Sequence, residues 1–111
     1  MPSKEELYDE AIELQQQGKM EEAIAKLRQL AADEPAYALA YAALGVFMSR
    51  LDRHDEAIEH ARKVCELEPQ DPFSFVAMSL ICQKAGNNSE AEQAMIAAQQ
   101  AEIVARQEPS E

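Results

Sequence analysis

The sequence is poor in aromatic residues, glycine, cysteine and positive charge, and these shortages exclude several classes of protein. Aromatics make up 5% of the 111 residues, tryptophan is absent, and 10 basic residues stand against 21 acidic ones, for a net charge of −11. Nucleic acids and anionic membrane surfaces favour a basic surface, so neither is expected as a partner. No apolar run approaches the ~20 residues of a membrane span, so membrane insertion is not expected either.

The N-terminus and the cysteines predict a cytoplasmic protein. The opening residues, Met-Pro-Ser-Lys-Glu-Glu, lack the apolar stretch of a signal peptide. The two cysteines, Cys65 and Cys82, occupy packing positions on helices that we expect to run antiparallel. We place them about 10 Å apart along the helix axes, at 1.5 Å per residue, which is beyond the reach of a disulfide. Two buried free thiols fit a reducing compartment.

What the chain has in quantity is a pattern of alanine-rich segments that repeats every 34 residues. Residues 52–69 align with residues 18–35 when shifted by this period, so that Glu-Ala-Ile and Glu-Pro coincide. Shifted forward, the same segment aligns with the Glu90-Ala91 pair. A fixed period of this size is typical of stacked supersecondary units.

Local signals predict an all-α chain. Ser3 with Glu6 forms a capping-box signature, Asp71-Pro72 combines an N-cap with a first-turn proline, and no window shows sustained strand alternation. The expected helices span about residues 3–17, 19–33, 36–51, 54–67, 72–85 and 87 or 88 to 106. The acidic tail that follows the last helix is expected to be disordered.

Small residues recur where paired helices would cross. In the first helix of each pair a small residue stands between two larger ones on one face, and the second helix also offers a small residue. These residues are Ala11, Gly45 and Ser79, opposite Ala23, Ala57 and Ala91. The pattern resembles the tetratricopeptide repeat over residues 4–105. Two positions depart from the family pattern, Leu7 in place of an aromatic residue and Ile103 in place of a terminal proline, which lets the last helix run on.

The resemblance implies a single domain over residues 1–111, an α-solenoid of three stacked helix-turn-helix repeats in a short right-handed superhelix. The repeats would span residues 4–37, 38–71 and 72–105, with a short tail at 106–111. The positions that are small or apolar inside the stack become polar at both ends. They are Glu6, Asp9 and Glu13 on the first helix and Asn88, Glu92 and Gln99 on the last. Repeat arrays need such polar outer faces, so we expect a self-contained array.

Residues for chemistry are scarce. His54 and His60 are six residues apart on one helix and do not converge on a metal, and we expect His54 in a repeat interface and His60 on the solvated side. No nucleophile–base pair and no glycine-rich phosphate loop is present. We therefore expect no enzyme, no cofactor and no metal.

The resemblance also implies a ligand-binding concave side, lined by the first helix of each repeat. Carried over to this chain, the family's contact positions form a mostly apolar trough with a polar lip, although an alternative is that neighbouring repeats bury part of it. The trough residues are Tyr8, Ile12, Leu39, Val46, Phe73, Val76 and Leu80, and the lip residues are Gln16, Arg50 and Lys84.

The basic clamp by which some family members hold acidic chaperone tails is absent. Its places are taken by Tyr8, Ile12, Ala43, Phe73 and Val76. The trough resembles instead members that bind a hydrophobic or amphipathic segment of another protein. Bacterial secretion chaperones with three such repeats are one example, although their additional N-terminal helix has no counterpart here. We therefore predict an adaptor.

The alternative is a self-associating structural module, a homo-oligomer formed through the trough or through the last helix. The stripe of that helix that suggests it consists of Ile96, Gln100 and Ile103. Ile96 stands where the first two repeats carry Arg28 and Arg62, so an apolar residue replaces a charged one there.

Overall fold

The computed structural model of the chain describes residues 1–107, and within them it contains six α-helices and no strand. The helices are α1 (Lys4–Gln16), α2 (Met20–Asp33), α3 (Ala38–Arg50), α4 (His54–Leu67), α5 (Pro72–Lys84) and α6 (Asn88–Gln107). The all-α prediction is confirmed, and every helix begins and ends within about two residues of its expected limits. Residues 108–111, the end of the expected tail, lie outside the described residues.

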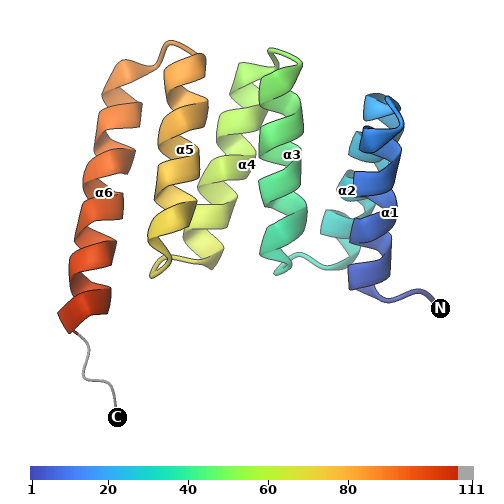
Figure 1. The fold of residues 1–111 in the computed structure, drawn as a ribbon, viewed down its shortest axis with the longest axis horizontal. Helices are drawn as coiled ribbons and strands as arrows, with labels where there is room; N and C mark the ends of the chain where they lie inside the picture. The colour runs from blue at the N-terminus through green and yellow to red at the C-terminus, as the bar shows by residue number, and fades with distance from the viewer. Residues whose placement is uncertain (108–111) are drawn as a thin grey trace.

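The six helices form an α-solenoid of antiparallel hairpins. Figure 1 shows them as a row in which α1, α3 and α5 lie nearer the viewer than α2 and α4, while α6 lies at the end of the row beside α5. No helix in the described part is long and apolar enough to cross a membrane.

The helix starts follow the local signals in the sequence. Before α1, the Glu6 amide donates a hydrogen bond to the Ser3 hydroxyl at 3.1 Å, and the Ser3 amide donates to the Glu6 carboxylate. This reciprocal arrangement is a capping box. Before α5, the Asp71 carboxylate accepts from the Phe73 amide at 3.0 Å, and Pro72 occupies the first turn. Both predicted caps are confirmed.

The small residues at the helix crossings are all buried. The three on the first helices, Ala11, Gly45 and Ser79, and the three on the second helices, Ala23, Ala57 and Ala91, are shielded from solvent. A Cβ atom added to Gly45 would lie 3.4 Å from the Ala57 carbonyl oxygen. The corresponding Ser79 hydroxyl donates to the Ala91 carbonyl at 3.0 Å. The predicted close approach of paired helices is confirmed.

The two ends of the row are polar, as predicted. Glu6, Asp9 and Glu13 are exposed on α1, whereas their α3 counterparts Ala40, Ala43 and Phe47 are buried. On α6, the exposed end residues are Asn88, Glu92 and Gln99. Ala77 on α5 differs from the expectation for an internal position, because it is exposed and adds to the apolar surface of that helix.

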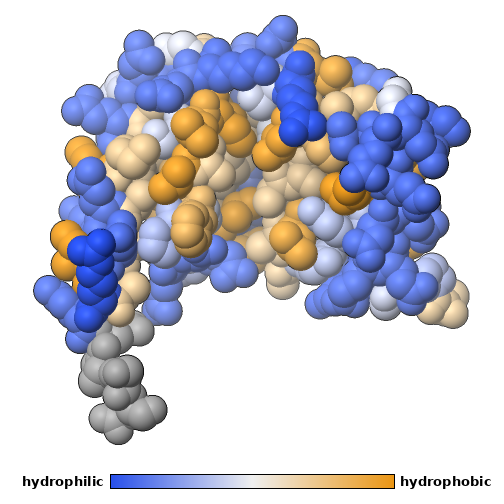
Figure 2. Space-filling model, in the orientation of Figure 1, coloured by the Kyte–Doolittle hydropathy of each residue, from blue (hydrophilic) through white to orange (hydrophobic). Residues whose placement is uncertain are grey.

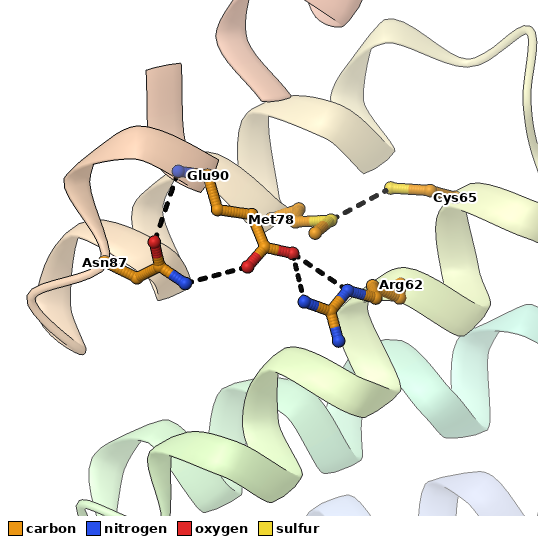
Figure 3. A network of polar contacts seen from close by, with 5 residues as sticks. All are labelled: Arg62, Cys65, Met78, Asn87 and Glu90. Carbon is orange, nitrogen blue, oxygen red and sulfur yellow. Dashed lines mark hydrogen bonds and ion pairs between the residues drawn. The ribbon is translucent and has the colours of Figure 1, made fainter. Parts of the chain in front are cut away.

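Arginine–glutamate pairs join each second helix to the next one along the row. Arg28 on α2 donates to Glu56 on α4 at 2.7 Å, and 34 residues later Arg62 on α4 donates to Glu90 on α6 through Nε at 2.8 Å. Figure 3 shows Arg62 extended toward Glu90, whose carboxylate also accepts a hydrogen bond from the Asn87 side-chain amide. The period of the sequence is thus also the period of the ion pairs between repeats.

One histidine differs from the prediction. The sequence places His60 on the solvated side, but the residue is half-buried, and its ring lies 6.2 Å from that of Tyr41 between centroids. Burial lowers the pKa of His60. The expectation is wrong because the aromatic ring of the preceding helix covers a position that a single-helix projection leaves open.

Candidate protein-binding groove

The most exposed apolar surface of the first helices lies on α3 and α5. Its four residues form two pairs, each spaced by seven residues and therefore aligned along one side of its helix. The exposed fractions are 50% for Leu39, 38% for Val46, 78% for Phe73 and 57% for Leu80. Figure 2 shows hydrophobic atoms gathered over the middle of this face, where Figure 1 places α3 and α5, with hydrophilic atoms around them. We call these four residues the apolar patch.

A shallow hollow lies within the apolar patch between α3 and α5. Its volume is about 220 Å³, and its lining includes Val46, Arg50, Leu80 and Lys84. Four of the residues predicted for the trough and its lip are therefore neighbours in the structure. Ser49 and Ile81 also line the hollow, and Ile81 was not predicted for the site.

Lys84 is held by the neighbouring helix. Its ammonium group donates to the Ser49 carbonyl at 2.8 Å and lies 3.9 Å from the Asp52 carboxylate. This carbonyl belongs to the last turn of α3, where a cation is favoured by the helix dipole. The contact spans 35 residues of sequence, so spacing along one helix could not reveal it. Lys84 therefore joins α5 to α3 at the edge of the hollow.

Arg50, the other basic lip residue, is exposed, and its guanidinium carbon lies 5.9 Å from the centroid of the Phe47 ring on its own helix. Gln16, the lip residue of α1, is also exposed. The lip therefore presents two exposed cations, Arg50 and the helix-bound Lys84, and the exposed amide of Gln16.

The part of the predicted trough on α1 is more closed than the part on α3 and α5. Tyr8 and Ile12 are half-buried against the core, and the Tyr8 ring meets the Tyr37 ring edge-on at 6.3 Å between centroids. Val76 on α5 is also half-buried. These residues support the groove wall more than its open surface, as the alternative of partial burial between repeats anticipated.

The α1 side of the groove carries negative charge. The pKa of Tyr37 is raised, first by desolvation and then by the charges of Glu5 and Asp9. The only described cation against this ring is Lys4, whose ammonium lies 5.1 Å from the Tyr37 centroid. The groove thus has acidic residues on α1 and two basic residues, Arg50 and Lys84, at the C-terminal ends of α3 and α5 beside the apolar patch.

A second hollow, which the sequence did not reveal, lies beside the last turns of α6. Its volume is about 340 Å³, and it lies between α6 and the start of α5. Its lining residues include Phe75, Gln100 and Val104. One feature of the sequence could have indicated this hollow. Ile103 replaces the terminal proline of the repeat, so α6 continues, and its last turns form one wall of the hollow.

The described residues offer little chemistry. Among residues 1–107 no three His, Cys, Asp or Glu side chains are grouped so as to hold a metal ion. Cys65 and Cys82 are both free thiols, and burial raises the pKa of each. In Figure 3 the Cys65 sulfur points toward the sulfur of Met78, which lies 3.8 Å away. These thiols are packing residues in low-polarity surroundings, which makes them poor nucleophiles.

The six antiparallel helices define the chain as a helical-repeat protein, and its first helices carry the exposed apolar patch. Residues 38–71 match the family model for the tetratricopeptide repeat. The middle hairpin is therefore a tetratricopeptide repeat, and the chain has the fold of a tetratricopeptide repeat protein with three repeats. None of the curated proteins matches the sequence.

Solved structures share this fold at low sequence identity. A crystal structure of MamA protein is 25% identical with a TM-score of 0.85, over 98% of this chain and 60% of that one. The Yersinia enterocolitica type III secretion translocator chaperone SycD is 22% identical with a TM-score of 0.79, over 93% and 84%. The second tetratricopeptide domain of Spaghetti (RPAP3), bound to the HSP90 peptide SRMEEVD, is 20% identical with a TM-score of 0.75, over 86% and 88%. The chain thus spans less than two thirds of the length of the MamA protein.

Proposed function

We propose that the chain is a non-enzymatic adaptor that binds an apolar or amphipathic segment of another protein in its concave groove. The observation that carries this proposal is the apolar patch, whose four large side chains are exposed on neighbouring helices. Removing apolar surface from water contributes roughly 25 cal/mol per Å². Large apolar side chains that are exposed together on one face, as Figure 2 shows, are a feature of interaction sites.

The hollow between Val46 and Leu80 supports a defined mode of binding. An amphipathic helix presents large side chains at intervals of three and four residues, and one such side chain would enter the hollow. Phe73 and Leu39, at the other end of the apolar patch, would contact further apolar side chains of the same segment. The net charge of −11 favours a segment flanked by basic residues, since complementary charge accelerates association.

The similar structures support a role in protein binding. One is a chaperone of a secretion translocator, one is bound to a peptide, and a further one is a CopN–Scc3 complex. The acidic-peptide mode is not proposed for this chain, because Tyr8, Ile12 and Phe73 stand where the basic clamp would be. A chaperone-like or scaffolding role for an apolar segment, in the cytoplasm, is the form of the proposal that the residues support best.

Self-association is the second candidate function. It is favoured by a separate observation, the exposure of 48% of Ile96 and 50% of Ile103 on α6. These residues lie on the last helix, away from the apolar patch of α3 and α5.

A displayed library of amphipathic segments tests the adaptor. We expect the chain to select segments with apolar residues at helical spacing, and the variant Leu80→Glu to lose at least about tenfold in affinity, because a carboxylate would be desolvated in the hollow. Fluorescence anisotropy of the selected peptide measures this loss.

Ile103→Glu is the matched control, since Ile103 is about as exposed as Leu80 but lies on α6. It should bind the selected peptide like the unmodified chain. Equal affinities of the unmodified chain and Leu80→Glu, with both folded by circular dichroism, would refute the groove as the binding site.

A further inference from the structure

The outward face of α6 carries apolar residues on the side opposite to its packed side. The packed side is formed by Ala91, Ala94 and Ala98, which are buried. Ile96 follows Ala94 by two residues and therefore points about 200° away around the helix. Ile103 is seven residues further along and lies on the same line. These two isoleucines form a short apolar stripe at the end of the row, where Figure 1 shows only α5 beside α6.

The ion pairs between repeats argue against head-to-tail stacking of copies through this stripe. At both internal junctions an arginine of one repeat donates to a glutamate of the next, Arg28 to Glu56 and Arg62 to Glu90. Ile96 occupies the equivalent place at the end of the row. A copy stacked head-to-tail would bring Glu22, the equivalent glutamate of its first repeat, toward Ile96 in place of an arginine. It would also oppose the acidic outer face of α1 to Glu92, so charge repulsion disfavours that arrangement.

We propose that α6 pairs with α6 of a second copy in an antiparallel, two-fold symmetric contact. With the axis crossing between Gln99 and Gln100, Ile96 of one copy lies beside Ile103 of the other, and the symmetry repeats this contact. A two-fold interface must be self-complementary in this way. The stripe can satisfy the requirement because both of its residues are isoleucines, exposed by 48% and 50%, so that the contact pairs like with like.

The charges that flank the stripe fit the same register. Glu92 lies four residues before Ile96, and Arg106 lies three residues after Ile103, so the antiparallel pairing brings Glu92 close to Arg106 of the other copy. Within residues 1–107 Glu92 has no ion-pair partner, while Arg106 makes an exposed contact with Glu102 at 2.5 Å. The two ends of the stripe on each helix therefore carry opposite charges, and each end of the two-fold interface joins one Glu92 to one Arg106.

This inference rests on the second candidate function and not on the groove. A contact through single helices is at the small end of stable interfaces, so sedimentation velocity should cover about 10 μM to about 1 mM. We expect the mean mass to rise from 12.4 kDa toward twice that value. Ile96→Arg, which restores the residue type of the other repeats, should remain folded and monomeric throughout. Ile96→Leu and Leu80→Glu should both dimerise like the unmodified chain.

The register is tested by crosslinking with a short bismaleimide. A mixture of Glu92→Cys and Arg106→Cys should give a mixed 92–106 product, with no crosslink in the unmodified chain, whose thiols are buried or half-buried. A monomer at all concentrations, or a dimer that persists in Ile96→Arg, overturns this proposal. Either result leaves the proposed function of the groove unaffected. Products joined 92 to 92 and 106 to 106 would overturn the antiparallel register.

Discussion

Asp52 shows how a single backbone position relates the three repeats. Among the described residues it is the one non-glycine residue with positive φ, at 60°, in the turn between α3 and α4. The equivalent turns of the other repeats use Gly18 and Gly86, with φ of 82° and 83°. An aspartate tolerates this left-handed conformation better than most residues, but glycine adopts it without a Cβ penalty.

Asp52→Gly is therefore predicted to raise the free energy of unfolding by about 0.5–1 kcal/mol. Relief of the left-handed strain, roughly 1–2 kcal/mol, exceeds the added entropy of the unfolded chain, roughly 0.5–1 kcal/mol. The substitution also removes an exposed ion pair to Lys84 at 3.9 Å and a contact with the His54 imidazole at 3.8 Å, which stabilise little. Urea unfolding followed by circular dichroism measures the change. Asp52→Ala removes the same carboxylate but keeps a Cβ, and it should give no such gain.

His60 is predicted to make the protein less stable in mild acid. Burial lowers the pKa of His60 in the folded state below that of the unfolded chain, about 6.5. Both states are neutral well above that value, so no penalty exists there. As the pH falls below it the unfolded chain takes up the proton first, and the free energy of unfolding falls.

His60→Gln should reduce this acid sensitivity. Urea unfolding at about pH 7.5 and about pH 5.5, on either side of the unfolded pKa, measures the fall for each protein. We expect a smaller fall in the variant, and an equal fall would show that the buried imidazole does not contribute.

At the scale of the helix, α5 has a side-chain cap at its start that α2 and α4 lack. The N-terminal positions of α2 and α4, Lys19 and Arg53, form no side-chain cap, whereas Asp71 caps α5 through the Phe73 amide. The first turn of α5 carries Phe73, the most exposed member of the apolar patch. The cap therefore positions part of the groove.

Asp71→Ala is predicted to cost about 1 kcal/mol of stability, the usual value for a lost N-cap. Thermal unfolding by calorimetry measures this as a lower Tm. Asp71→Asn keeps the acceptor oxygen and should retain most of the stability. If both variants lowered the Tm equally, the negative charge at the helix start and not the hydrogen bond would be the stabilising feature.

At the scale of the whole molecule, the net charge of −11 opposes the compact state. The six ion pairs that Lys and Arg make in the described residues are mostly exposed and contribute little against it. Raising the NaCl concentration from about 10 mM to about 100 mM shortens the screening length from about 30 Å to about 10 Å. We therefore predict that the Tm rises with salt. A falling Tm would show instead that the arginine–glutamate pairs between repeats dominate.

Much of the fold was determined by the sequence alone. The 34-residue period, the small residues at the crossings and the caps at Ser3 and Asp71 act over one turn of helix or one hairpin, so their consequences can be read from spacing. The polar ends of the row follow in the same way, because repeat positions that are small or apolar at an internal junction are charged or polar there. These predictions needed only local geometry and the assumption that equivalent positions make equivalent contacts.

The tertiary structure decided which of these residues remain in contact with water. Tyr8 and His60 lie partly covered by Tyr37 and Tyr41, and Lys84 is held by the end of α3, 35 residues earlier. Such contacts join residues of different helices, so they depend on how the hairpins tilt against one another, which no spacing along a single helix specifies. The apolar patch on α3 and α5 exists for the same reason, since the packing of the hairpins leaves those side chains exposed.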